Sequence, residues 1–461
     1  MYTKKTYQDY LTADNKPFFI ANCIKEYKGS RFFKLACKSE QYFNGETDIM
    51  NAVRKTIMRK YERIDDTGEM TPTAHEVSYN NNHISNNFIK RFVTQEVQYL
   101  LNNGLRADFD KYSEFGKNID YVIQKSAEKA ILHGETALFW NNGNLELFPL
   151  ASKNGFSGMF FLQDESDSTI RLGVRFWQLN AEKPLYFEIY DEQGIFTYTI
   201  NERQNRPILQ AQRAYIKRKT ETAIGVKVED VKLGYLPFVI LRADEYGQGI
   251  LSDNIKTKID LYDKILSDFG DNMERLEGIY WAIKNFGGTV EQARCMLADI
   301  EKYKMAINQG DMSAEPSSIE APFNARKFAL ELLERELYRD CMALNFDEIT
   351  GTSLTNIAIY TAKANLDMKC NALEYQIFDM LARLTDLIGK PDMFQKIQNF
   401  QRMDIANKSE IVRDIYIMRN DISRRKALEL NPYIDDDEIQ ELLNEADTED
   451  MGIDELPEVS R

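Results

Sequence analysis

The chain has 461 residues, 43% of them hydrophobic, so it is long enough to bury sizeable cores, and its length predicts roughly three domains. Its 73 acidic and 58 basic residues give a formal net charge of −15, which argues against a protein that grips nucleic acid along its general surface. No apolar signal core opens the sequence, and no run approaches the roughly 18 to 20 apolar residues of a membrane span. We therefore expect synthesis in the cytoplasm and no membrane partner.

The first 150 residues predict mainly helices. Apolar residues at helical spacing mark a helix that ends near Leu101, with Gly104 as its stop. From Thr136 to about Ile240, short β-branched and aromatic runs predict an antiparallel sheet with hairpin turns at Asn142-Gly143 and at 191–194.

A basic patch lies within this predicted sheet region. It consists of Arg213, Lys217, Arg218 and Lys219. These side chains suit either phosphate contacts or solvated strand positions, and the second interpretation carries more weight.

Residues 252–281 predict a long helix with a packing seam. Its apolar residues alternate in steps of four and three over almost four heptads, which favours packing against another helix. The seam residues are Ile255, Ile259, Tyr262, Leu266, Phe269, Met273, Leu276 and Tyr280. The predicted partner helix presents Phe328, Leu332, Leu333, Leu337, Cys341 and Leu344 on one face. Between the two helices, residues 284–323 predict a compact insert of short strands, one helix and a proline-containing loop.

The longest predicted helix runs from Leu354 to Ile388. Apolar or small residues recur along one side at steps of three and four, and Gly389 and Pro391 end the helix after about 54 Å. The residues of this side are Ile359, Ala362, Leu366, Cys370, Leu373, Ile377, Met380, Leu384 and Ile388. A strut in a large helical bundle explains such a helix as well as a functional role does. Shorter helices are predicted at 394–400, 408–421, 423–431 and 435–446, with Ser423 and Asp435 as N-caps, and an acidic tail follows.

The sequence contains no recognisable catalytic or metal-binding motif. Its three histidines belong to no nucleophile or zinc pattern, and its lysines after glycine lack the flanks of a phosphate-binding loop. Its five cysteines are scattered without a Cys-x-x-Cys pair, which favours reduced, packed thiols. We expect no cofactor, no metal and no enzymatic activity.

The order of these parts resembles the portal proteins of long-tailed double-stranded DNA phages of Gram-positive hosts. The resemblance covers nearly the whole chain. It rests on five segments in the family's order: YFNGETDIM at 42–50, HISNNFIKRFVTQEVQYLL at 83–101, EIYDEQGIFTYTI with LGYLPFVIL, IKTKIDLYDKILSDFGDNME at 255–274, and ITGTSLTNIAIYTAKA at 349–364. In the last, Gly351-Thr352-Ser353-Leu354 stands where the family has Ser-Gly-x-Ala-Leu.

The resemblance implies an α+β portal-type subunit with named regions. The wing would comprise residues 1–250, the stem helices 251–283 and 324–345, the clip 284–323, the tunnel loop 346–353, the long wing helix 354–389, the helical crown 390–446 and the acidic C-terminal tail 447–461. Stem packing would use Ile255, Ile259, Tyr262, Leu266, Phe269, Met273 and Leu276. The tunnel loop facing DNA would present Asp347, Glu348, Ile349, Thr350, Gly351, Thr352 and Ser353. We expect the clip to bind partners through Lys284, Arg294, Lys302 and Lys304.

The same resemblance implies a place and partners in a phage particle. About twelve copies would form a ring at the capsid portal vertex, with double-stranded DNA passing through it during packaging and ejection. The implied partners are the terminase motor, the major capsid protein and scaffold, and a head-completion adaptor, and the implied location is the virion after assembly in the host cytoplasm.

Two other classes of protein stay open. A metal-dependent nuclease that acts in DNA packaging can draw its carboxylates from positions far apart in sequence, so no local motif is required. Another helical head-to-tail connector would differ in subunit number and in lacking a clip. Metal-dependent DNA cleavage by the purified protein would distinguish the nuclease.

Overall fold

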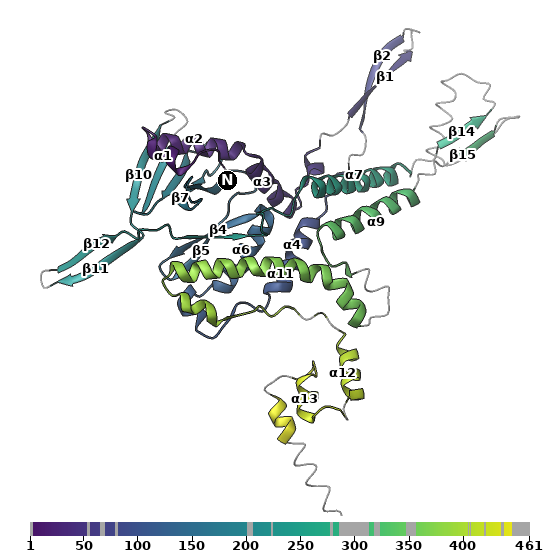
Figure 1. Cartoon of the computed structure of the whole chain (residues 1–461). Coiled ribbons are helices and arrows are strands. Elements are labelled where there is room, and N and C mark those ends of the chain that lie inside the picture. Colours follow the sequence, from purple (N-terminus) through teal and green to yellow (C-terminus); the bar gives the residue numbers. More distant parts are fainter. Residues whose placement is uncertain are drawn as a thin grey trace, which may run out of the picture.

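The computed structural model combines helices with antiparallel sheets, which confirms the predicted α+β class (Figure 1). It describes residues 3–52, 56–64, 70–78, 82–200, 206–222, 225–276, 280–284, 313–317, 323–346, 356–403, 405, 407–418, 421–434 and 438–444. Within these ranges, no helix is long and apolar enough to cross a membrane.

The N-terminal part is helical, as predicted. Three helices begin at residues whose side chains accept hydrogen bonds from the first turn, namely Thr6, Asn15 and Ser30. They are α1 (Tyr7–Thr12), α2 (Lys16–Gly29) and α3 (Arg31–Phe43), and a 3₁₀ turn, η1 (Asp48–Asn51), follows. Further along lie α4 (Phe88–Leu101), α5 (Lys111–Phe115) and α6 (Ile119–His133), and Gly104 adopts φ +70° after α4.

A two-stranded ribbon interrupts this helical part and was not predicted. Strand β1 (Thr56–Ile64) pairs with β2 (Met70–Ser78) in antiparallel register. In Figure 1 the ribbon extends from the body beside α7.

The predicted sheet region contains two sheets and a separate ribbon. The larger sheet has the order β10-β9-β8-β7-β6, the smaller one β13-β4-β5, and β11 pairs with β12. Their bounds are β4 (Glu135–Asn141), β5 (Asn144–Phe148), β6 (Ser157–Gln163), β7 (Ile170–Trp177), β8 (Leu185–Tyr190), β9 (Ile195–Ile200), β10 (Pro207–Arg213), β11 (Ile216–Thr222), β12 (Gly225–Val231) and β13 (Phe238–Arg242). Both predicted hairpin turns are confirmed, and Asn142 and Gly143 have the positive φ values, 41° and 101°, of a tight turn between β4 and β5.

Two hydrophobic clusters join the helices to the sheets, and a third packs the two sheets together through residues such as Phe139 and Tyr190. The first joins α2 and α3 to the larger sheet through buried aromatic and aliphatic residues such as Tyr27, Phe160 and Phe176. The second joins α4, α6, the smaller sheet, the long helix and the bases of α7 and α9. The helix pair and the long helix are thus anchored in one core.

The helix pair forms as predicted but with different ends. Helix α7 spans Asp253–Leu276 and α9 spans Phe323–Asp340. The first helix was expected to continue to Trp281, but Tyr280–Lys284 is strand β14. It pairs with β15 (Ser313–Ser317), which was expected to be a loop because it contains Pro316. A two-stranded ribbon tolerates proline because each strand leaves one edge unpaired.

The long helix is confirmed as α11 (Asn356–Leu387). Gly389 follows with φ +74°, and the N–H of Lys390 donates to the carbonyl of Thr385 at 2.9 Å, a glycine-dependent helix end. The predicted buried side is largely correct from Ile359 to Leu384. Ala362, which was assigned to that side, is exposed.

The C-terminal part follows α11 with small elements. Residues expected to form a helix at 394–400 instead make the 3₁₀ turn η2 (Pro391–Lys396) and strand β16 (Ile397–Gln398), which pairs with β3 (Arg106–Ala107). Helices α12 (Lys408–Ile417) and α13 (Arg424–Glu429) confirm the next two predictions, and the Ser423 side chain caps α13. Residues 438–444 are helical, while the predicted cap at Asp435 lies outside the described residues.

Candidate functional site

The α7–α9 pair is the first candidate surface, because it carries the predicted seam. Ile255 and Ile259 are buried at its base, whereas Tyr262, Leu266 and Phe269 are half-buried. Met273 is 50% exposed, and the side chain of Leu276 is not described. The seam residues are therefore buried at the base of the helix pair and become more exposed toward its other end.

Aromatic and polar contacts fix α7 against its neighbours. The Phe269 and Phe323 rings meet edge to face at 5.6 Å between centroids, which joins α7 to the start of α9. Near the base, Asp340 accepts hydrogen bonds from Asn254 and Lys258 at 2.9 and 2.7 Å. Tyr262 packs edge to face on Phe88 of α4.

The partner helix is less covered than its periodicity predicts. Leu337, Cys341 and Leu344 are buried, but Phe328 is 66% exposed and Leu332 is 44% exposed. Among the described residues, the half of α9 that lies away from the body thus presents exposed apolar side chains at Phe328 and Leu332.

A stripe of polar side chains on α7, undetected in the sequence, binds an extended segment at 82–87. Asp271 accepts from the N–H of Asn82 at 2.8 Å, Ser267 from the N–H of Ile84 at 3.0 Å, and Asp263 from the Asn86 amide at 2.7 Å. Four residues of helix rise about 6 Å, and two extended residues advance about 6.6 Å, so the two spacings match. The pairing holds the segment before α4 along α7.

Asp263 is the buried member of this stripe. It also accepts a hydrogen bond from the Thr47 hydroxyl at 2.6 Å, and burial raises the pKa of its carboxyl above the ordinary value.

Two substitutions of Asp263 should have opposite consequences. Asp263→Ala leaves the Thr47 hydroxyl and the Asn86 amide unpaired and should lower the free energy of unfolding by about 1 to 3 kcal/mol. Asp263→Asn keeps both hydrogen bonds, because the Thr47 hydroxyl can rotate to accept. As pH rises through the raised pKa of Asp263, its buried carboxyl ionises and the free energy of unfolding of the wild-type protein falls. Asp263→Asn does not ionise, so the stability of this variant relative to the wild type should increase between pH 4 and pH 7. Urea unfolding at both pH values measures the difference, and equal effects of Ala and Asn would contradict this role.

The predicted tunnel loop is the second candidate surface. Residues 347–355, which include all of the residues predicted to face DNA, lie outside the described residues, and the described chain ends before them at Phe346 and resumes at Asn356. On one side, the Gln95 side chain exchanges two hydrogen bonds with the backbone of Leu344, both at 2.9 Å. On the other side, the N–H of Asn356 donates to Glu410, and the Asn356 side chain accepts from the N–H of Asn407 at 2.8 Å. The segment therefore begins against α4 and ends against α12.

Most of the predicted clip residues also lie outside the described part of the chain. Only Lys284 falls in a described element, at the end of β14, and its side chain is not described. Arg294, Lys302 and Lys304 lie outside the described ranges.

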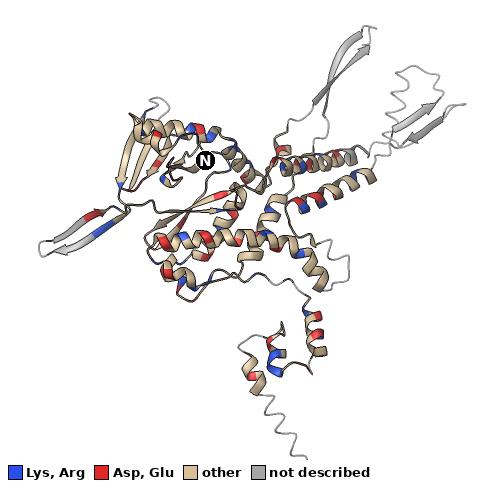
Figure 2. Cartoon of the chain, in the orientation of Figure 1, with Lys and Arg blue, Asp and Glu red and all other residues tan. Residues whose placement is uncertain are grey.

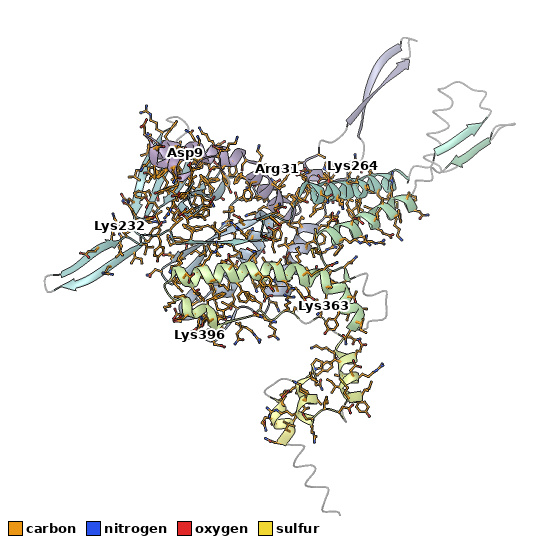
Figure 3. All side chains as sticks on the ribbon, in the orientation of Figure 1. Asp9, Arg31, Lys232, Lys264, Lys363 and Lys396 are labelled. Carbon is orange, nitrogen blue, oxygen red and sulfur yellow. The ribbon has the colours of Figure 1, made fainter. Side chains whose placement is uncertain are left out.

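Helix α11 is the third candidate surface, and ion pairs hold it to the body. Lys369 pairs with the buried Glu96 of α4 at 2.6 Å. Arg402 pairs with Asp367 and Glu374, each at 2.9 Å. Figure 3 labels Lys363 near the start of α11 and Lys396 shortly after the end of that helix.

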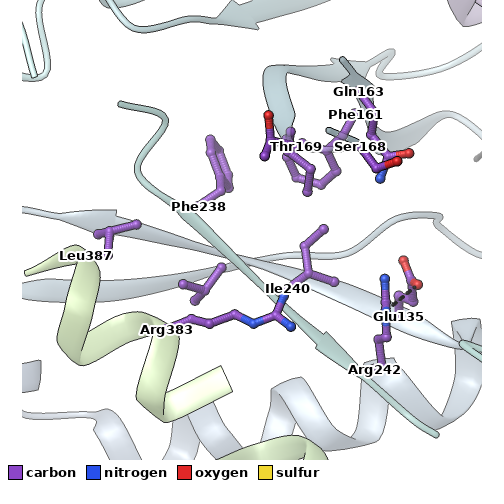
Figure 4. A pocket seen from close by; sticks show the side chains of 12 residues that line it. Glu135, Phe161, Gln163, Ser168, Thr169, Phe238, Ile240, Arg242, Arg383 and Leu387 are labelled. Carbon is purple, nitrogen blue, oxygen red and sulfur yellow. Dashed lines mark hydrogen bonds and ion pairs between the residues drawn. The ribbon is translucent and has the colours of Figure 1, made fainter. Parts of the chain in front are cut away.

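A hollow of about 420 Å³ lies beside the C-terminal end of α11 (Figure 4). Arg383 of α11 points into it across Ile240, while Arg242 and Glu135 form an ion pair at 3.1 Å on its floor. Burial raises the pKa of Glu135. In the ranges that the structure describes, no group of three or more His, Cys, Asp or Glu side chains is placed to hold a metal ion.

The basic patch predicted on the strands divides between two elements. Arg213 ends β10 and pairs with the buried Glu188 at 3.1 Å. Lys217 and Arg218 are exposed on β11, in the ribbon that extends from the larger sheet (Figure 2). Lys217 and Arg218 are thus solvated, Arg213 makes a structural ion pair, and the side chain of Lys219 is not described. The phosphate-binding interpretation gains no support from these contacts.

Comparisons with known proteins give one family match and two similar chains. The model of the family described as "Phage portal protein, SPP1 Gp6-like" matches residues 24–451. The chain is 23% identical over 401 residues to a portal protein of Clostridium phage phiCD119, covering 78% of this chain and 84% of that protein. A solved chain from the virion of a native gene transfer agent particle aligns with a TM-score of 0.40 and 11% identity, over 78% of this chain and 90% of that chain.

Proposed function

The chain belongs to the SPP1 Gp6-like family of phage portal proteins, and from this premise we propose that about twelve copies close into a ring around a DNA channel. The ring sits at the capsid portal vertex, where double-stranded DNA passes through it during packaging and ejection. The subunit performs no catalysis in this proposal, because the terminase motor hydrolyses ATP.

The observation that carries the ring is the uncovered apolar side of the α7–α9 pair. Met273, Phe328 and Leu332 are 50%, 66% and 44% exposed on two adjacent helices. Exposed apolar side chains gathered on neighbouring elements favour a protein interface. Neighbouring copies would cover these side chains if the pairs stand side by side around an axis.

The crown supports the same arrangement. Neither α12 nor α13 has a buried residue, and Tyr416 and Ile417 of α12 and Tyr433, which follows α13, are each more than 60% exposed. Helices of ten residues or fewer are marginal without packing partners. We assign these helices, with residues 390–446, to a crown that is stabilised by contacts between subunits.

We assign the remaining regions by the same premise. The wing is residues 1–250, the stem is built on α7 and α9, the clip is the insert at 284–323, and α11 is the long wing helix at 354–389. Residues 346–353 form the tunnel loop. Family membership supports this assignment, together with Gly351, which relieves the backbone, and the threonines, which can meet phosphates without gripping them.

The negative net charge of the subunit favours a channel in which DNA slides over one that binds DNA tightly. Each subunit carries −15, and DNA carries about one negative charge per 1.7 Å of its axis. Many phosphate contacts would make a salt-sensitive clamp, whereas an acidic or mixed channel repels the duplex and lets it slide.

The clip is proposed to dock the terminase during packaging and the head-completion adaptor afterwards, with Lys284, Arg294, Lys302 and Lys304 as basic contacts. Arg294→Glu with Lys302→Glu should weaken terminase binding by at least tenfold, since each reversal replaces an attractive contact with a repulsive one. Binding of purified rings to terminase, measured at several salt concentrations, tests this. The double substitution Lys25→Glu and Lys90→Glu makes the same charge change on α2 and α4 and should bind normally. Wild-type affinity in the clip variant would refute the basic contact.

A further inference from the structure

One side of α11 is exposed and carries no charge between Asn356 and Gln376. Every residue of this stretch that is classed as exposed is uncharged, in a chain with 28% charged residues. These residues are Ile357, Tyr360, Thr361, Ala362, Ala364, Asn365, Met368, Asn371, Ala372 and Tyr375. We call them the uncharged face of α11.

The charged residues of the same stretch point elsewhere. All four of them are only partly exposed, and their contacts lie on the flanks of the helix or at the edge of the uncharged face, where Lys363 lies over Tyr360 and Arg402 also donates to Asn371. Asp367 and Glu374 bind Arg402, Lys369 binds Glu96, and the Lys363 ammonium lies 4.6 Å from the centroid of the Tyr360 ring. Charge returns to the exposed side only beyond this stretch, at Asp379, Arg383 and Asp386.

The uncharged face is long and shaped for close approach. Ile357, Met368 and Tyr375 are 79%, 55% and 74% exposed. Steps of eleven and seven residues keep them within about 20° of one line along the helix, over about 27 Å. Ala364 and Ala372 lie between them, so another backbone can come near. The buried side of α11, from Ile359 to Leu384, faces the opposite way.

We propose that the uncharged face of α11 packs against a neighbouring copy of this chain in the ring. Two copies that each carry −15 repel each other across charged surfaces, and like charges opposed at an interface are costly. A face without charge is where such copies can approach. Duplex DNA is the poorer occupant, because phosphates are bound by cationic and hydrogen-bonding groups rather than by Ile and Met side chains.

Ring symmetry adds one requirement. Contacts between successive subunits in a ring join two different surfaces, so this face meets a different part of the next copy. The inference rests on the proposed ring and adds an interface on the long helix to that of the α7–α9 pair.

Met368→Glu tests this interface in the full-length protein. Met368 is more than half exposed, so the subunit should fold as before, which thermal melting checks. Rings of the variant should dissociate at a protein concentration at least tenfold higher than wild-type rings, because the interface would bury an unpaired carboxylate. Leu179→Glu is the matched control: Leu179 is 81% exposed in the loop between β7 and β8, and this variant should assemble normally.

A photo-reactive phenylalanine analogue at Tyr375 identifies the occupant. We expect cross-links from Tyr375 to another copy of the chain in assembled rings, and none in separated subunits. Intact Met368→Glu rings, or cross-links only within one chain or to added DNA, would overturn the inference while leaving the ring in place. If the wild-type protein formed no rings at all, the proposed function would fail first and the inference with it.

Discussion

Phe328→Asp should leave a folded subunit that forms no stable ring. Phe328 is 66% exposed on α9, so the subunit itself loses little when the side chain becomes polar. In the ring we expect this side chain to be covered by a neighbouring helix pair. An unpaired carboxylate there costs several kcal/mol, and every subunit interface carries it.

Light scattering after size-exclusion chromatography measures the outcome. Phe328→Leu keeps an apolar side chain and should form rings, so the contrast isolates the charge. Phe269→Asp is a less informative test, because Phe269 packs on Phe323 within one subunit and its loss would disturb the helix pair itself. If Phe328→Asp formed normal rings, the exposed apolar side of α7 and α9 would not be part of the interface between subunits.

Glu348→Lys should allow heads to form but slow DNA packaging by at least tenfold at low salt. If residues 347–353 line the channel, the substitution places a ring of about twelve ammonium groups against the duplex. Even 6 to 10 phosphate contacts make binding strongly dependent on salt, so the ring would grip DNA that must slide. The defect should ease as the salt concentration rises.

Glu348→Gln provides the matched control, since it removes the carboxylate without adding a cation. It should package DNA at close to the wild-type rate. A packaging assay in which Glu348→Lys fills heads at the wild-type rate in low salt would place this segment away from the DNA.

Short-range sequence patterns predicted the elements that depend mainly on interactions between residues close in the chain. The long helix was evident from apolar residues at steps of three and four that end at Gly389, and the β4–β5 hairpin from Asn142-Gly143. The β1–β2 ribbon escaped prediction because its residues do not alternate clearly between apolar and polar.

Contacts between segments that lie far apart in the chain could not be predicted from the sequence. Asp263, Ser267 and Asp271 have the spacing of an ordinary solvated stripe, and nothing local indicates that residues 82–87 bind them. The apolar periodicity of α9 likewise predicted that Phe328 and Leu332 are buried in the subunit. Periodicity shows that one side of a helix is apolar, but it does not show whether the same subunit or another one packs against that side.

The uncharged face of α11 left a signal in the sequence that a search for one apolar side overlooks. Ile357, Ala364, Met368 and Tyr375 lie opposite the buried side, so the helix has a second side without charge. Counting charged residues on each side of the helix, rather than apolar residues alone, would have revealed it.

Native mass spectrometry of the purified wild-type protein, combined with electron microscopy of the same sample, tests the central claim most directly. The ring proposal predicts a closed particle of about twelve subunits, close to 640 kDa for a subunit of 53.6 kDa, with an open channel along its axis. A protein that stays a monomer or dimer at micromolar concentration, or a closed particle without an axial channel, would contradict the account.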